Sequence, residues 1–139
     1  MKCVMITGSS GFLGKILKNK LKNYNFFNYD IINGFDICNL NQLDNFVKKN
    51  DIKTIIHLAA VADLNKFQDN CKTGDKINIT GTKNIINTCE KNKIRLLFAS
   101  TCCCYGNNNC HPSNEESNLC PTEPYARSKM ISEEDIKKS

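Results

Sequence analysis

The sequence lacks an apolar run long enough to span a membrane, and its N-terminus leads straight into strand-like residues without a signal-peptide pattern. It also lacks a basic block with interleaved aromatic residues, because the lysines behind its net charge of +5 are scattered along predicted helix faces. We therefore expect a cytoplasmic protein that binds neither membranes nor nucleic acids. With 139 residues, of which 40% are hydrophobic, the chain is long enough for one domain with a real core, spanning residues 1–139.

A metal-binding C-x-x-C pair is also missing, although the chain has nine cysteines. The densest group is the run of three at 102–104, which is followed by Cys110, His111 and Cys120. Three consecutive side chains cannot all point at one ion from an extended backbone. We therefore predict no metal site. Without a secretory signal, the thiols are expected to stay reduced and to pack as small hydrophobic groups.

A glycine-rich turn is the most informative feature that is present. Residues 7–14 read TGSSGFLG, follow the apolar run 3–6 and open a helical pattern. Gly8 permits a tight turn, Gly11 removes the Cβ that would block a pyrophosphate, and Gly14 lets the helix pack closely on the strand. Backbone N–H groups at the start of the helix would face the anion. The pattern predicts a phosphate cradle, and a turn that binds no ligand is the alternative.

Arginine is scarce, and this bears on the acidic residue that follows the turn. Asp30 ends a second apolar run, 26–29, a little over twenty residues beyond Gly8. Its carboxylate would lie beside the adenosine ribose of a dinucleotide, where it accepts hydrogen bonds from the hydroxyls and repels a 2′-phosphate. The only arginines, Arg95 and Arg127, are far from it in the sequence. We expect NAD rather than NADP, and a solvated aspartate at a strand end is the alternative.

Apolar runs and helical patterns alternate along the chain, which predicts strands joined by helices. The predicted strands are 2–7, 26–30, 36–38, 55–60 and 96–99, and the predicted helices are 12–23, 41–49, 71–91 and 124–138. The first helix is expected to carry Phe12, Leu13, Ile16, Leu17 and Leu21 on one face. The alternation predicts an α/β fold, a Rossmann-like doubly wound parallel sheet of about five strands in the order 3-2-1-4-5.

Ligands bind such a sheet at the carboxyl ends of its strands, and several candidate residues fall there. Asp30 ends the second strand, and Asp36 and Ile37 follow the next loop. Residues 58–60 close the fourth strand with the sequence Leu-Ala-Ala. The alanines would leave room for a flat ligand against the backbone, although a packing role explains them equally well.

A second group of residues could carry catalysis. Ser100 and Thr101 end the last predicted strand, and Tyr125 and Lys129 share one face of the final helix. An ammonium near a phenol lowers the phenol pKa from about 10 toward neutrality, so that Tyr125 would serve as a general acid/base. The Thr101 hydroxyl would hold the substrate oxygen. Tyrosine and lysine at this spacing also occur by chance.

Five motifs follow one another along the whole chain: Thr7-Gly8-x-x-Gly11-x-x-Gly14, His57-Leu58-Ala59-Ala60, Asn78-x-x-Gly81-Thr82, Ser100-Thr101 through Tyr105-Gly106, and Pro124-Tyr125-x-x-x-Lys129. Together they resemble the extended short-chain dehydrogenase/reductases. These are the NAD-dependent epimerase/dehydratase enzymes that act on nucleotide sugars.

The resemblance implies a role for each position, with NAD as the cofactor and no metal. The implied cofactor-binding residues are Gly8, Gly11, Phe12, Leu13 and Gly14 in the glycine turn, Asp30 at the ribose, Asp36 and Ile37 at the adenine, Leu58, Ala59, Ala60, Asn78 and Ser100 along the cofactor path, and Tyr125 and Lys129. The implied catalytic residues are Thr101, Tyr125 and Lys129. Tyr125 would exchange a proton with a sugar hydroxyl, and Lys129 would bind the nicotinamide ribose and tune Tyr125.

The residues after Thr101 bear on the reaction. Cys102 and Cys103 stand where the 4,6-dehydratases carry an Asp-Glu pair, so the resemblance points to a UDP-glucose 4-epimerase-like reaction instead. The short connection from Asp30 to Asp36 is similar to that of dTDP-4-dehydrorhamnose reductases and GDP-fucose synthases. A nucleotide-sugar reductase is therefore the alternative, with Cys102 either as an acid/base or as a packing thiol.

Family members continue well beyond Lys129 with a substrate-binding region, whereas this sequence ends at Ser139. We therefore expect the C-terminal substrate region to be lacking and an apolar sheet edge at 96–99 to be exposed. The chain is then either the N-terminal part of an active enzyme on a nucleotide-sugar substrate or a truncated NAD-binding fragment without catalysis. Because related enzymes build a four-helix bundle from helices 71–91 and 124–138, a homodimer is also expected.

Overall fold

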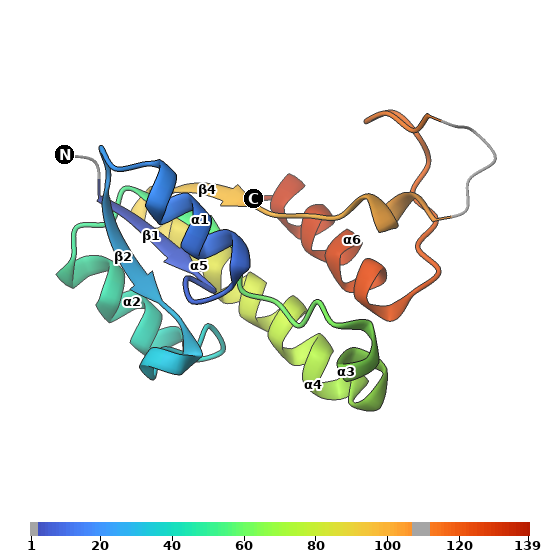
Figure 1. Ribbon diagram of the computed structural model, residues 1–139, viewed down its shortest axis with the longest axis horizontal. Helices are drawn as coiled ribbons and strands as arrows, with labels where there is room; N and C mark the ends of the chain where they lie inside the picture. Colours follow the sequence, from blue (N-terminus) through green and yellow to red (C-terminus); the bar gives the residue numbers. More distant parts are fainter. Residues whose placement is uncertain (1–2, 107–111) are drawn as a thin grey trace.

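The computed structural model describes residues 3–106 and 112–139, and these form a four-stranded parallel sheet with helices around it (Figure 1). The strands are β1 (Cys3–Thr7), β2 (Asn25–Tyr29), β3 (Thr54–His57) and β4 (Arg95–Phe98). Their order across the sheet is β2-β1-β3-β4, and each neighbouring pair is parallel. This confirms the predicted doubly wound sheet and brings the carboxyl ends of the strands to one edge.

Helical segments connect and flank the strands. They are α1 (Phe12–Lys20), the 3-10 helix η1 (Ile31–Asn33), α2 (Leu40–Lys49), α3 (Leu64–Asp69), α4 (Cys71–Asp75), the π-helix η2 (Lys76–Gly81), α5 (Thr82–Asn92), the 3-10 helix η3 (Cys102–Tyr105) and α6 (Pro124–Lys137). Figure 1 shows α1 and α5 on opposite sides of the sheet. Among the described residues, the structure has no helix that is both long and apolar enough to cross a membrane.

The hydrophobic core lies between the sheet and the pair of helices α2 and α5. Its buried members come from the sheet and from both helices: Met5, Tyr29 and Ile55 from the sheet, Leu43 and Val47 from α2, and Ile85 and Cys89 from α5. These side chains are the apolar runs and helical faces that the sequence pattern singles out. Burying them is the main favourable contribution to folding.

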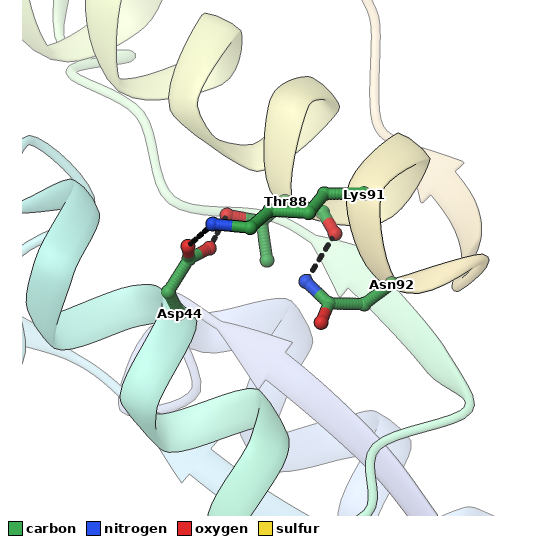
Figure 2. A network of polar contacts seen from close by, with 4 residues as sticks. All are labelled: Asp44, Thr88, Lys91 and Asn92. Carbon is green, nitrogen blue, oxygen red and sulfur yellow. Dashed lines mark hydrogen bonds and ion pairs between the residues drawn. The ribbon is translucent and has the colours of Figure 1, made fainter.

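A polar network joins α2 to α5 at the rim of this core (Figure 2). The Thr88 hydroxyl donates to one carboxylate oxygen of Asp44 at 2.9 Å, and the Lys91 ammonium donates to the other at 2.6 Å. Asn92 donates to the Thr88 carbonyl at 2.8 Å and so closes the end of α5. The hydrogen bond from Lys91 holds the pKa of the Asp44 carboxyl below its usual range.

The predicted strand at 36–38 is wrong, because these residues form a turn rather than a ladder. The Asp36 amide donates to the Gln42 side-chain oxygen at 2.8 Å, and the Asp36 carboxylate accepts the Cys38 amide at 2.8 Å. Side chains therefore satisfy backbone groups that a strand would have paired with a neighbour. The remaining four strands keep the predicted order.

The predicted helix at 71–91 is not one regular helix. It is divided into α4, the π-helix η2 and α5, and the short helix α3 precedes it. The π-helix carries the buried residues Asn78 and Gly81. A Cβ at Gly81 would come within 2.6 Å of the Ile37 side chain, so glycine allows η2 to press against the turn at 36–38. Such π turns interrupt helices mostly at functional sites.

Most of the apolar face predicted for α1 is exposed. Phe12 is 79% exposed and Leu13 is 54% exposed, and Gly14 is the buried residue of this helix. On β4, Leu97 is 42% exposed, which confirms the expected exposure of the edge strand. A substantial apolar surface therefore faces solvent on the α1 side of the sheet.

Candidate functional site

The glycine turn has the shape of a phosphate cradle between β1 and α1. Gly8 has φ +66, a left-handed conformation, and a Cβ there would lie 2.8 Å from the Ala59 amide nitrogen. A Cβ at Gly14 would lie 2.7 Å from the Ser9 Cα, so glycine is required for α1 to start this close to the turn. The Ser9 hydroxyl is buried and finds no partner among the described residues. A close turn with an unsatisfied hydroxyl at a helix start fits an anionic group.

Asp30 ties the glycine turn to the end of β2. One carboxylate oxygen accepts the Ser10 amide at 2.8 Å, and the other accepts the Ile32 amide at 3.1 Å. The residue is 8% exposed. Each carboxylate oxygen can accept a second hydrogen bond, so Asp30 keeps the capacity to bind ribose hydroxyls. The structure thus places the carboxylate beside the glycine turn.

A cavity of about 760 Å³ opens beside the turn and Asp30 at the carboxyl ends of the strands. It brings together eight of the predicted cofactor-binding residues: Gly8, Gly11, Asp30, Asp36, Ile37, Leu58, Ala59 and Ala60. Its volume lies in the range of natural small-molecule and cofactor sites. The donors, the carboxylate and the apolar walls together fit a dinucleotide.

Several residues that line this cavity do not belong to any sequence motif. Ile31 and Ile32 line it while remaining 69% and 78% exposed, and Thr73 and Lys76 line it as well. Sequence reasoning missed Thr73 and Lys76 because their direction depends on the irregular start of the helix. Asn70 caps α4 by accepting the Thr73 amide at 3.0 Å, and this cap is the one local signal that could have located the turn.

His57 is a structural residue behind the cavity wall. The Thr7 hydroxyl accepts the amides of Leu58 and Ala59, each at 3.1 Å, and lies 2.6 Å from His57 Nδ1. Because these two amides use both lone pairs of the Thr7 hydroxyl, its proton must point at His57 Nδ1, which accepts it. The hydrogen of the neutral ring is therefore on Nε2, which donates to the Thr82 hydroxyl at 3.0 Å. Burial, followed by the charge of Lys129, lowers the pKa of His57 to about 3. The neutral ring therefore fixes the loop at 58–60.

Asn78 acts on the same loop from η2 and is 2% exposed. Its side chain accepts the Val61 amide at 2.8 Å and donates to the Val61 carbonyl at 3.1 Å and to the Ser128 hydroxyl at 3.0 Å. The sequence motif assigns Asn78 to the cofactor path. The structure places it behind the wall of that path, where it joins the loop after β3 to α6.

Lys129 is buried at the carboxyl end of β4. Its ammonium donates to the Ala99 carbonyl at 2.9 Å and lies 4.5 Å from the centre of the Phe98 ring. Burial lowers the pKa of Lys129 to about 8, while nearby Cys104 and Glu133 act in the opposite direction. The charge of Lys129 is thus directed at the strand end.

Tyr125 stands one helical turn before Lys129 on α6 and is half-buried. Burial, followed by the thiols of Cys103 and Cys104, raises the pKa of Tyr125 above its ordinary value. The expected lowering of this pKa is wrong here, because Lys129 faces Ala99 and Phe98 while apolar surroundings disfavour the phenolate. The thiols that act on Tyr125 are those of Cys103 and Cys104, and not that of Cys102, which the reductase alternative singled out.

Ser100 and Thr101 lie in a second, smaller cavity of about 330 Å³, which Cys102 and Glu133 also line. Thr101 caps η3 by accepting the Cys103 amide at 3.2 Å, and the Ser100 hydroxyl is hydrogen-bonded to Glu133 of α6. Ser100, which the resemblance assigns to cofactor binding, thus lines the smaller cavity and not the large one.

The remaining predicted cofactor residues lie on α1, outside the walls of the large cavity. Phe12 and Leu13 open this helix at the rim of the glycine turn, and Gly14 forms its close contact with Ser9. Among the described residues, no three His, Cys, Asp or Glu side chains gather in a metal-binding cluster. Cys110 and His111 lie outside the described residues.

Comparisons with known proteins agree with this geometry. A family model described as the NAD dependent epimerase/dehydratase family matches residues 4–139. ADP-L-glycero-D-manno-heptose-6-epimerase of Brachyspira hyodysenteriae is 33% identical over 91% of the chain and 45% of its own length. UDP-glucose 4-epimerase of Pisum sativum is 26% identical over 98% of the chain and 48% of its own length.

A solved structure shows the same arrangement of the chain. The dTDP-4-dehydrorhamnose reductase from Bacillus anthracis, in complex with NADP, is 26% identical with a TM-score of 0.91 over 99% of this chain and 50% of that one. The chain therefore spans about half the length of the proteins that it matches. The family description confirms NAD as the cofactor that the sequence predicts. The chain belongs to the NAD-dependent epimerase/dehydratase family.

Proposed function

We propose that this chain is the cofactor-binding and acid/base part of a nucleotide-sugar epimerase that acts like the UDP-glucose 4-epimerases. The observation that carries the proposal is the large cavity, because it joins the glycine turn, Asp30 and the loop at 58–60 at one edge of the sheet. Cys102 and Cys103 in place of a carboxylate pair support epimerisation over dehydration. The sugar-binding groups would come from the half of the relatives that this chain does not match.

In this proposal each site residue has a distinct task. NAD, when bound, supplies the acceptor and then the donor of a hydride at a sugar carbon. The glycine turn holds the pyrophosphate, Asp30 holds the adenosine ribose, and Asp36 with Ile37 flanks the adenine. Lys129 holds the second ribose, and Leu58, Ala59, Ala60 and Asn78 shape the path between the two ends.

The proton transfers fall to Tyr125. Its phenolate oxygen takes the proton of the sugar hydroxyl during oxidation, and the hydroxyl so formed returns the proton during reduction, while Thr101 holds the sugar oxygen. The phenolate that takes the proton is disfavoured by the burial of Tyr125. A positive charge is therefore needed near the phenol in the reacting complex, and Lys129 is the cation that α6 offers one turn away.

A nucleotide-sugar reductase is the second candidate, and one observation favours it. The raised pKa of Tyr125 keeps the phenol protonated, which suits the general acid of a reduction. A thiol beside it could serve as a further acid/base in a reductive epimerisation, and Cys103 fits that position better than Cys102. The fold likeness to the reductase from Bacillus anthracis is consistent with this candidate.

The proposal also includes the assembly of the chain. We expect a homodimer in which the helices of the 71–91 region and α6 form a four-helix bundle, as the family resemblance implies. In the described part of one chain, Lys83 of α5 lies 3.5 Å from Asp135 of α6, so the two helices already pack together. Both would contribute to the same dimer face.

The cofactor and the reaction can be tested separately on the full chain. Calorimetric titration should show NAD binding that weakens at least about tenfold in Asp30→Ala, while Asp51→Asn, an exposed control, binds like the parent. Incubation with UDP-glucose and with a 4-keto nucleotide sugar should reveal turnover that falls about 100-fold or more in Tyr125→Phe. Turnover that persists in Tyr125→Phe would exclude the proposed acid/base. NAD binding without turnover would leave a cofactor-binding fragment.

A further inference from the structure

Phe67 on α3 is a buried aromatic residue that lines neither cavity. It is 1% exposed although α3 is a short helix of six residues. Its ring meets the ring of Tyr125 edge to face, with the ring centres 6.4 Å apart and an angle of 69° between the planes. This arrangement is the preferred one for aromatic pairs. Phe67 is therefore packed directly against the residue proposed as the acid/base.

The Phe67 ring packs directly against Gly74 of α4. A Cβ at Gly74 would lie 2.8 Å from both Cε2 and Cζ of Phe67 and 2.9 Å from Cδ2. Glycine is a poor helix former, so its presence inside α4 has a packing reason. The Phe67 ring occupies the space that any larger side chain at position 74 would need.

A second tie holds the segment that carries Phe67. Asn78 binds the Val61 backbone before α3 and the Ser128 hydroxyl on α6. The Ser128 hydroxyl in turn donates to the Tyr125 carbonyl at 2.7 Å. Backbone and ring of Tyr125 are thus both connected to the segment at 61–78, the first through Asn78 and the second through Phe67.

We propose that Phe67, seated on Gly74, is a positioning residue for Tyr125: its ring fixes the orientation of the phenol and keeps water from one side of it. The catalytic consequence rests on the function proposed above, whereas the packing consequence does not. A smaller side chain at 67 would let the Tyr125 ring turn and would hydrate it. Because burial is the main cause of the raised pKa of Tyr125, hydration would lower that pKa. The Cys103 and Cys104 thiols, which also raise this pKa, are not changed by the substitution.

Nuclear magnetic resonance of the full chain with labelled tyrosine rings tests this proposal. The chain has four tyrosines, and loss of one signal in Tyr125→Phe assigns the signal of interest. In Phe67→Leu we expect this signal to shift and the acid dissociation constant of Tyr125 to rise about threefold or more. Phe46→Leu is the matched control, because Phe46 meets Tyr29 edge to face at 5.1 Å. It should move the Tyr29 signal and leave Tyr125 unchanged.

Gly74→Ala provides a second route to the same result. It displaces the Phe67 ring without removing it, and alanine favours the helix, so the fold is expected to be kept. The Tyr125 signal should shift in this variant as in Phe67→Leu. A Tyr125 signal and titration identical to the parent in both variants would overturn the proposal.

If the parent chain shows turnover, the rate of turnover tests the catalytic consequence of the proposal. We expect kcat to fall about tenfold in Phe67→Leu with little change in KM, and Phe67→Tyr, which keeps the ring, to recover most of it. A decrease in kcat accompanied by an increase in KM of the same factor would contradict a positioning role. A shifted Tyr125 signal in a parent without turnover would contradict the proposed function and leave the positioning role intact.

Discussion

At the scale of single residues, His57 has the clearest energetic consequence. The Thr7 proton already points at Nδ1, so protonating the ring would set two hydrogens against each other inside a fully buried site. Burial, followed by the charge of Lys129, lowers the pKa of His57 in the folded protein to about 3. In the unfolded chain the ring has its ordinary pKa of about 6.5.

This difference predicts how stability depends on pH. Below pH 6.5 the unfolded state binds a proton that the folded state refuses, so the free energy of unfolding should fall by about 1.4 kcal/mol per pH unit as the pH decreases. Above pH 6.5 the contribution is complete and constant. Urea unfolding at pH 7.5, 6.0 and 5.0 measures the slope. His57→Gln should be less stable at pH 7.5 and should lack this slope. An equal slope in both proteins would assign the pH dependence to another group.

At the scale of helices and strands, the polar part of the contact between α2 and α5 is centred on one carboxylate, that of Asp44. Asp44 is 13% exposed and receives both Thr88 and Lys91, whereas Asp51 is 78% exposed and pairs with Lys53 at the same 2.6 Å distance. A partly buried carboxylate with two donors contributes more than an exposed pair of equal length.

Asp44→Asn should therefore lower the free energy of unfolding by about 1–2 kcal/mol at pH 7, while Asp51→Asn should change it by less than about 0.5 kcal/mol. The folded state holds the pKa of Asp44 below its unfolded value, so this stabilisation is present above about pH 4 and is lost as the pH falls further. Chemical unfolding of the three proteins at pH 7 and pH 3 measures both effects. Equal losses in the two variants would show that burial of Asp44 adds nothing.

The same scale shows what the sequence can predict. β1 and β3 contain the apolar runs that predicted them: β1 starts one residue after its predicted start, and β3 starts one residue before its predicted start and ends three residues before its predicted end. The turn at 36–38 resembles a strand in composition. Its Asp36 amide, however, donates to the side chain of Gln42, which lies outside the short stretch that the strand pattern considers. The glycine turn and Asp30 are local motifs and were predictable. Thr73, Lys76 and Phe67 depend on the π-helix and on α3, whose direction is set by long-range contacts with Ile37 and α6.

At the scale of the whole molecule, the two faces of the sheet differ in how completely helices bury their apolar side chains. The face toward α2 and α5 carries the core, while on the other side Ile16 of α1 is 38% exposed and Leu97 of β4 is 42% exposed. β4 is also one of the two edge strands of the sheet among the described residues. An apolar edge of this kind invites association with other chains.

We therefore expect that the double variant Ile16→Lys and Leu97→Lys associates less than the parent chain at high concentration. Because both side chains are partly exposed already, the free energy of unfolding should change by no more than about 1 kcal/mol for each. Leu43→Lys, which places a charge in the closed core, should instead prevent folding. Light scattering across a concentration series distinguishes the possible assemblies. A dimer formed through α5 and α6 would persist in the double variant with twice the mass of the chain, whereas association through the α1 side would disappear. Unchanged growth of the scattering mass in the double variant would show that this apolar side does not drive association.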